Sequence, residues 1–196
     1  PVVVIVTLSL LVALAVVVSH TEECAPSPVL AADTDRFKAI MYRCYGSPDV
    51  LQLEDVPKPV PADNEVLIKV HAAAVNPLDW HYMRGSPYFM RLMSGIGAPK
   101  DETMGVDFSG TVEAVGTTVS RFKPGDAVFG ARGGAFGEYV LMPEDRAVVP
   151  KPDNVSFEEA AAVPIAGITA LQALRDKGQL QPGQRVMING AYGGVG

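Results

Sequence analysis

The last residues of the chain carry its clearest chemical pattern. Ala191, Gly193 and Gly196 have the spacing of a glycine-rich dinucleotide-binding turn, with alanine in place of the first glycine. Small residues let the backbone turn tightly and approach a pyrophosphate, with the amides of a following helix aimed at the anion. The pattern alone is weak, because an ordinary glycine-rich turn between a strand and a helix has the same letters. The residue that distinguishes NAD from NADP would lie about 20 positions further on.

Such a turn needs a strand before it, and the preceding residues suit one. Residues 184–190, QRVMING, are a short apolar run that predicts a buried strand. Upstream, a capping box that begins at Ser156 predicts the start of a helix. Pro164 interrupts this helix, residues 166–176 resume it, and Gly178 fits its end. The order of helix, strand and glycine turn is typical of the beginning of an α/β nucleotide-binding domain.

The earlier part of the chain has a different texture. Short β-rich runs separated by Gly, Pro and Asp turns favour a small barrel or sandwich, and no helical periodicity of useful length is found among them. The runs are KAIMYRCYG, EVLIKVHAAAV, FSGTVEAVG, DAVFG and EYVLMP. We therefore predict a two-domain α/β chain. Residues 1–19 form a hydrophobic helix, 20–36 a linker, 37–153 a β-barrel domain, and 154–196 the truncated start of a nucleotide-binding domain.

The first residues are strongly apolar. Residues 2–18 include only Thr7 and Ser9 as polar members and carry no charge, which is close to the roughly 20 residues that span a bilayer. We expect a membrane tether; the alternatives are a cleaved signal peptide and a wrongly assigned start. The protein would then be membrane-anchored or exported if this segment is genuine, and cytoplasmic otherwise. Because the chain starts at Pro1 and stops inside a motif, we also expect it to be a fragment.

Composition narrows the function classes. The chain has 196 residues, 48% of them hydrophobic, which suffices for a full core. It carries 22 acidic and 16 basic residues, and because the basic residues are scattered we expect no nucleic-acid partner. Cys24 and Cys44 have neither the number nor the spacing of a disulfide framework or a structural zinc site. We expect a reduced protein without a metal site.

From about Lys38 to Gly196 the chain resembles the medium-chain dehydrogenase/reductase superfamily, and within it the zinc-independent quinone oxidoreductases. The matching stretches are YGSPDVLQLEDVPKPVP, VHAAAVNPLDWHYMRG, GVDFSGTVEAVG, RFKPGDAVFG, GAFGEYV, SFEEAAAVPIAGITALQAL and VMINGAYGGVG. The resemblance implies a GroES-like barrel domain packed on a Rossmann domain, with a nicotinamide cofactor in the cleft between them. It favours NADPH, with NADH as the alternative, and implies a homodimer in many members.

Three positions depart from the zinc alcohol dehydrogenases of this superfamily. By resemblance, Asn76, Val106 and Ile165 stand where those enzymes have zinc-binding Cys, His and Cys. Neither Val nor Ile can donate a lone pair, so a tetrahedral catalytic zinc does not fit. The four-cysteine structural zinc loop is also absent from the sequence.

Without a Lewis acid, reduction of an electrophilic acceptor is easier than oxidation of an unactivated alcohol. We therefore expect an oxidoreductase that transfers hydride from NAD(P)H to a small hydrophobic quinone or α,β-unsaturated carbonyl, with this fragment itself inactive. The alternatives are an enoyl-thioester reductase and a non-catalytic NADPH-binding sensor or partner protein.

The resemblance also implies site residues. Asn76 would lie beside the nicotinamide, Tyr45 would donate to the acceptor, and Asp79 matches a supporting aspartate; each has a structural alternative as a turn asparagine, a packed aromatic or a solvated acid. His81 or Tyr82 would be a substrate contact or ordinary packing, and residues 88–93 an apolar mouth or core. The expected cofactor-binding residues are Asn76, Thr169, Asn189, Ala191, Gly193, Gly194, Val195 and Gly196.

Overall fold

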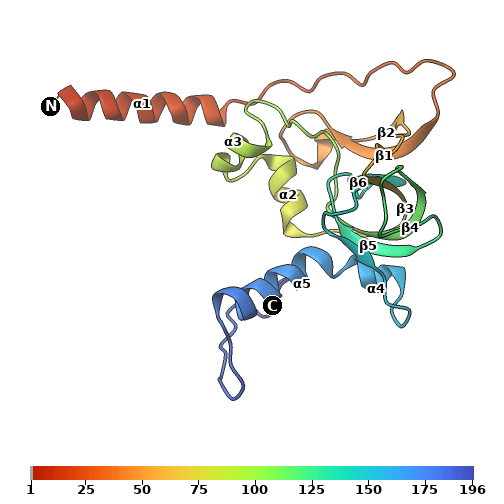
Figure 1. Ribbon diagram of the computed structural model, residues 1–196. Helices are drawn as coiled ribbons and strands as arrows, with labels where there is room; N and C mark the ends of the chain where they lie inside the picture. Colours follow the sequence, from red (N-terminus) through yellow and green to blue (C-terminus); the bar gives the residue numbers. More distant parts are fainter. Residues whose placement is uncertain (1) are drawn as a thin grey trace.

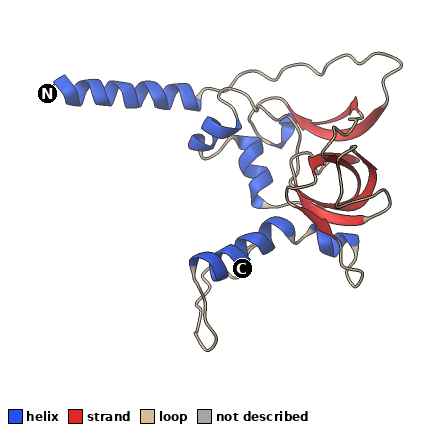
Figure 2. Ribbon diagram, in the orientation of Figure 1, coloured by secondary structure: helices blue, strands red, loops and turns tan. Residues whose placement is uncertain are grey.

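A curled five-stranded sheet is the centre of the computed structural model, which describes residues 2–196 (Figure 1). Its strands pair antiparallel in the order β6-β3-β4-β5-β7. They are β3 (Glu65–Ala74), β4 (Asp107–Val115), β5 (Ala127–Ala131), β6 (Tyr139–Pro143) and β7 (Val148–Pro150). Four of the five lie in the runs that predicted strands; β7 was not predicted. The curled sheet fits the expected barrel (Figure 2).

The core of this barrel follows from the two-residue period of its strands. Val66 and Ile68 of β3, Phe108 and Val112 of β4, and Val128 of β5 are all at most 1% exposed. Successive side chains of a strand point to opposite faces, so these alternating positions meet inside the curled sheet. Each such side chain contributes about 1.5–3 kcal/mol when it is fully buried.

A second, two-stranded sheet lies beside the barrel. It pairs β1 (Arg36–Tyr42) with β2 (Leu51–Pro57), and a short 3-10 turn, Pro48–Val50, precedes β2. The Ile40 amide donates to the Phe136 carbonyl and the Met104 amide donates to the Ile40 carbonyl, which ties this sheet to the barrel. The sequence predicted β1 but not β2.

The expectation of no helix within the barrel domain is wrong. Between β3 and β4 the chain forms α2 (Pro77–Arg84), the 3-10 turn Tyr88–Met90 and α3 (Arg91–Ser94). α2 begins with a capping box of Asn76 and Asp79 and ends at Gly85, whose φ of 56° is left-handed. The helix is too short to show a clear 3.6-residue period, so its caps are the readable signal.

The C-terminal part is helical at first and then irregular. The predicted capping box at Ser156 and Glu159 is confirmed at the start of α4 (Phe157–Ala161). α5 (Pro164–Leu171) and a π-helical turn, Gln172–Lys177, confirm the resumed helix, which ends at Gly178. The predicted strand over 184–190 is wrong: no strand is assigned there, and Met187 is 92% exposed. A strand requires a hydrogen-bonded neighbour, and within residues 2–196 none lies beside this segment.

The N-terminal helix α1 (Val2–Ser19) projects away from the barrel (Figure 1). The sequence predicted a membrane tether in residues 2–18; none of the helices in residues 2–196 is long and apolar enough to cross a membrane. The residues after α1 are held by Arg91, whose guanidinium donates to the His20 carbonyl at 2.7 Å. The expectation of a reduced protein is also wrong, because Cys24 and Cys44 form a disulfide.

Candidate active site

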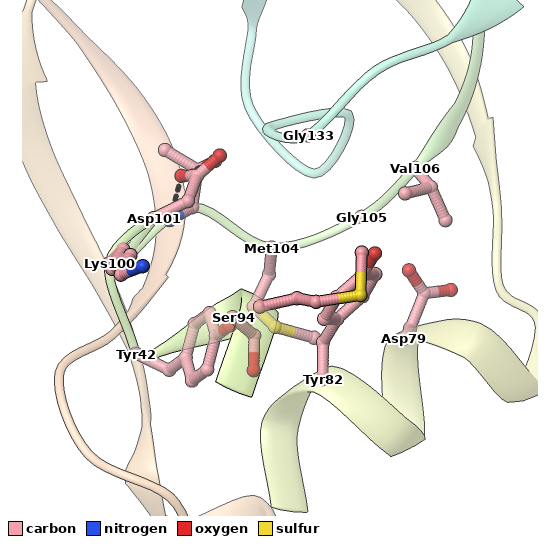
Figure 3. Close-up of a pocket in the computed structure, with 12 residues that line it drawn as sticks. Tyr42, Asp79, Tyr82, Ser94, Lys100, Asp101, Met104, Gly105, Val106 and Gly133 are labelled. Carbon is pink, nitrogen blue, oxygen red and sulfur yellow. Dashed lines mark hydrogen bonds between the residues drawn. The ribbon is translucent and has the colours of Figure 1, made fainter. Parts of the chain in front are cut away.

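A cavity of about 210 Å³ opens between α2, α3 and the segment that leads into β4 (Figure 3). The residues that carry its chemistry are Tyr42, Asp79, Tyr82, Ser94, Lys100 and Val106. Asp79 and Tyr82 are three positions apart on α2, so they lie on the same face of the helix and both reach the cavity. Met93 and Met104 add apolar surface. The cavity can therefore hold a small, mainly apolar molecule and offer it hydroxyl and carboxyl groups.

Asn76 stands at the start of α2, and its side-chain amide makes two hydrogen bonds. Its Oδ1 accepts from the Leu78 amide at 2.9 Å, and its Nδ2 donates to Asp107 Oδ2 at 3.2 Å. These two contacts distinguish the oxygen of the amide from its nitrogen, because the Leu78 N–H needs an acceptor and the Asp107 carboxylate needs a donor. One N–H of Nδ2 remains for a further acceptor. Asn76 is thus a helix cap that can also contact a bound molecule.

Asp107 connects the barrel to the C-terminal helices. Its carboxylate accepts from Asn76 and from the Ile165 amide, at 3.1 Å to Oδ1. Ile165 lies in the first turn of α5, where backbone amides have no partner within the helix. Asp107 satisfies one of them, and it therefore links the loop before α2 to α5 through a single buried side chain that is 2% exposed.

Burial controls the ionisation of the two carboxyl groups. It raises the pKa of Asp107 to about 6. The hydrogen bond from the Ile165 backbone N–H lowers this pKa, repulsion from Asp79 raises it, and the hydrogen bond from the Asn76 side chain lowers it. Burial also raises the pKa of Asp79, which is 4% exposed, although the backbone N–H of Asn76 opposes the shift. The two acids therefore hold their protons to higher pH than exposed aspartates do.

The tyrosines separate into two places. Tyr42 and Tyr82 line the cavity, and burial followed by repulsion from Tyr45 raises the pKa of Tyr42, which keeps its hydroxyl protonated. Tyr45 lies outside the cavity. Its hydroxyl contacts Ser94 Oγ at 2.9 Å and donates to the Gly95 carbonyl at 2.8 Å. A catalytic role of Tyr45 stays a prediction, and Tyr42 and Tyr82 take the positions beside the cavity.

The three positions singled out for their zinc-ligand alignment come together around Asp107. Asn76 and Ile165 both donate to its carboxylate, and Val106 is its chain neighbour and lines the cavity. The one oxygen in this set, Asn76 Oδ1, accepts from the Leu78 amide, and a single side-chain oxygen does not replace three zinc ligands. In the part of the chain that the structure describes, no group of three His, Cys, Asp or Glu side chains is arranged to hold a metal ion.

The glycine turn lies at a second cavity, of about 490 Å³, between α5 and residues 186–196. Asn189, Gly193, Gly194, Val195 and Gly196 line it. A Cβ on Gly196 would lie 2.4 Å from the Cα of Ala191, so the turn is folded too closely for a side chain. Within residues 2–196 the Gly194 and Val195 amides donate to no other group, so they are available to an anion. Binding of a dinucleotide phosphate by these residues stays a prediction.

Other predicted residues have local partners. The Thr169 hydroxyl donates to the Ile165 carbonyl at 2.6 Å, so this exposed threonine is engaged within α5. His81 Nδ1 contacts the Ser86 carbonyl at 2.6 Å and does not line the first cavity, whereas Tyr82 does. Of residues 88–93, Met93 reaches that cavity and Tyr88 stacks on Arg91. Sequence reasoning missed Asp107. This acid directly follows Val106, which stands where the zinc enzymes have a histidine ligand, and that position was a readable signal.

The sequence of this chain is similar to those of known proteins. The alcohol dehydrogenase GroES-like domain family matches residues 62–153. Quinone oxidoreductase from Sus scrofa is 40% identical over 170 residues, which are 85% of this chain and 49% of the relative. The chain thus spans about half the length of the curated relatives it matches.

Two solved structures are similar as well. An enoyl reductase, CurK, aligns with a TM-score of 0.75 and 31% identity over 82% of this chain and 49% of that one. Quinone oxidoreductase from Escherichia coli, solved with NADPH, aligns with a TM-score of 0.60 and 28% identity over 71% of this chain and 41% of that one. The chain therefore belongs to the medium-chain dehydrogenase/reductase superfamily, as a relative of its quinone oxidoreductases.

Proposed function

We propose that the protein containing this chain is an NADPH-dependent oxidoreductase that reduces a small quinone or α,β-unsaturated carbonyl without a catalytic zinc. The observation that carries the proposal is the donor set beside the first cavity. Val106 and Ile165 offer no lone pair where the zinc enzymes have ligands, so the side-chain oxygen of Asn76, which also accepts from the Leu78 amide, is left as a single donor where zinc needs three. What remains around the cavity is apolar surface with hydroxyl and carboxyl groups, which suits an acceptor that is already electrophilic.

The proposed cofactor is NADPH, with NADH as the alternative. The related quinone oxidoreductase solved with NADPH supports this choice, and the free amides of Gly194 and Val195 suit a phosphate. When bound, the dihydronicotinamide supplies the hydride. Asn76 would use its remaining N–H to orient either the carboxamide of the cofactor or the acceptor oxygen, and Tyr42 and Tyr82 would donate to the acceptor.

The test is NADPH consumption by the natural full-length protein with a panel of quinones and enones, with and without EDTA. We expect turnover with at least one acceptor, unchanged by the chelator. Turnover that EDTA abolishes and zinc restores would contradict the zinc-free reaction. Absence of turnover with every acceptor, despite cofactor binding, would favour a non-catalytic NADPH-binding protein.

An enoyl-thioester reductase is the second candidate, and the similarity to CurK favours it. Both substrate classes present an electrophilic C=C–C=O unit, so they need the same groups around the cavity. The two candidates separate by acceptor preference: a thioester enone reduced with a higher kcat/KM than any free quinone would select the second.

Residues 37–196 alone should neither bind NADPH tightly nor turn over. The turn from Ala191 to Gly196 is exposed, and within the described residues no strand supports it. Isothermal titration of this segment with NADPH checks the expectation, and micromolar binding would contradict it.

A further inference from the structure

The segment that follows α1 contacts the loop after α3 (Figure 1). We call residues 19–24 the strap; all of them are exposed, so little apolar surface holds the strap in place. Its contacts with the loop are polar. The Glu22 amide donates to the Gly97 carbonyl at 3.0 Å, and Thr21 forms a single β-bridge with Gly97.

A buried arginine connects the strap to α3 and to the end of α2. Arg91 is 3% exposed, and its Nη1 donates to the His20 carbonyl at 2.7 Å and to Thr21 Oγ1 at 3.0 Å. Its Nε donates to the Gly85 carbonyl at 2.9 Å, directly after α2. Through this one side chain, the strap is linked to both helices that border the first cavity.

The Cys24–Cys44 disulfide joins the strap to the chain just after β1. Cys24 is exposed and Cys44 is only 5% exposed, so a thiol in solution is expected to attack the Cys24 sulfur. Tyr45, the next residue after Cys44, donates its hydroxyl to the Gly95 carbonyl at 2.8 Å. Both ends of the disulfide therefore lead to the loop after α3, one through the strap and the other through Tyr45.

This loop continues directly from a wall of the first cavity. Met93 and Ser94 of α3 line the cavity, and Gly95 and Gly97 follow them in the chain. The two glycines have φ values of 129° and 81°, and glycine leaves the backbone more conformational freedom than any other residue. The shape of the loop therefore depends on the contacts it makes, and the strap supplies some of them.

We propose that the Cys24–Cys44 disulfide is a thiol-exchange site that holds the strap in place, and that its reduction loosens the cavity wall at Met93 and Ser94. The reductant is a dithiol. One of its thiolates attacks the Cys24 sulfur, the S–S bond breaks, and Cys44 leaves as a thiolate. The second thiolate of the reductant then displaces Cys24. Two electrons and two protons pass from the dithiol to the two cysteines, and the reductant becomes a disulfide.

The consequence for the reaction rests on the proposed reductase function. A looser wall holds the acceptor less well, so the form without the disulfide should have a KM for the acceptor that is about 5-fold higher or more. The KM for NADPH should not change, because the cavity at the glycine turn shares no lining residue with the first cavity.

The first test measures the strap without turnover, in the natural full-length protein. Hydrogen–deuterium exchange followed by mass spectrometry compares the oxidised protein with the protein reduced by dithiothreitol under native conditions. Peptides that cover the strap and residues 91–100 should exchange several-fold faster after reduction, whereas peptides from β3 should not change. Alkylation should find no free thiol at these two cysteines before reduction and two afterwards.

Two variants isolate the disulfide. Cys24→Ser, at an exposed position, should exchange like the reduced wild type and should not respond to dithiothreitol. Ala25→Ser is the matched control, because it introduces the same side chain one position along and leaves both cysteines in place. It should behave as the wild type before and after reduction. Thermal melts by circular dichroism verify that both variants are folded.

The second test is turnover of the natural full-length protein with its best acceptor. It compares wild type, Cys24→Ser and Ala25→Ser without dithiothreitol, because free thiols add to quinones and enones. The KM for the acceptor should rise about 5-fold or more in Cys24→Ser only.

The outcomes separate the two proposals. Equal exchange of residues 91–100 in the oxidised and reduced proteins would overturn the role of the disulfide, and so would two thiols that do not form a disulfide under mild oxidation. Faster exchange with an unchanged KM would show that the strap does not affect acceptor binding. If the wild type reduces no acceptor, the reductase function fails, and the exchange measurement still decides whether the disulfide holds the strap.

Discussion

The barrel and the C-terminal part of the chain both contain apolar runs, but these side chains are buried in the barrel and exposed in the C-terminal part. Val66 and Ile68 of β3 are completely buried, whereas Ile188 is 56% and Met187 92% exposed. Val66 and Ile68 lie between strands β4 and β6, which supply both hydrogen bonds and apolar neighbours. Residues 186–190 have no neighbouring strand within the described chain. An apolar run therefore becomes a buried strand only where other segments are present to cover it.

The largest expected difference between the two regions is in core stability. Phe108→Ala should lower the free energy of unfolding by about 3–5 kcal/mol, because it removes a large, fully buried side chain from the barrel. Met187→Ala, the control from the exposed region, should change it by about 0.5 kcal/mol or less. Urea denaturation followed by circular dichroism measures both. Equal effects would mean that the C-terminal part is packed in solution.

Asp107 should make the barrel's stability depend on pH. Its pKa is raised from 3.8 to about 6 in the folded chain, so the proton binds more tightly to the folded state. The stability contributed by the protonated group is present below pH 3.8 and is lost as the pH rises through about 6.

This dependence can be measured as a difference between two proteins. The free energy of unfolding of the wild type, relative to Asp107→Asn, should fall between pH 4 and about 6. Asp176→Asn is a control from the C-terminal region, since the Arg175 hydrogen bond lowers the pKa of Asp176. A constant difference across this window would show that folding does not raise the pKa of Asp107.

A smaller difference is expected between two asparagines. Asn76→Ala should cost about 1 kcal/mol, because it removes the cap of α2. Asn189→Ala should be close to neutral in thermal melts, since Asn189 is exposed. If both were neutral, Asn76 would serve substrate binding alone, and its hydrogen bonds to Leu78 and Asp107 would be unimportant for folding.

Local signals predicted much of this fold. The barrel strands, the capping box at Ser156 and the helix before Gly178 were all readable, because each depends on residues within a few positions of one another. α2 was also readable in principle: Asn76, Pro77 and Asp79 carry the signs of a helix start, but the helix is too short for periodicity to show it. β2 was missed because its pairing with β1 decides its structure.

In the candidate site too, some features follow from the sequence alone and others from the tertiary structure. The sequence alone determined the residue types that exclude zinc ligation at Val106 and Ile165, and the small residues of the terminal turn, since these follow from side-chain chemistry.

Only the tertiary structure decided which groups meet. It brought Asp107 to Asn76, 31 positions away, and to Ile165, 58 positions away. It also placed Tyr42 at the cavity and Tyr45 outside it. The physical reason is that desolvation and hydrogen-bond partners come from distant segments. The unpaired oxygen of Asp79, and the burial that raises the pKa of its carboxyl group, exist only when those segments have closed around it.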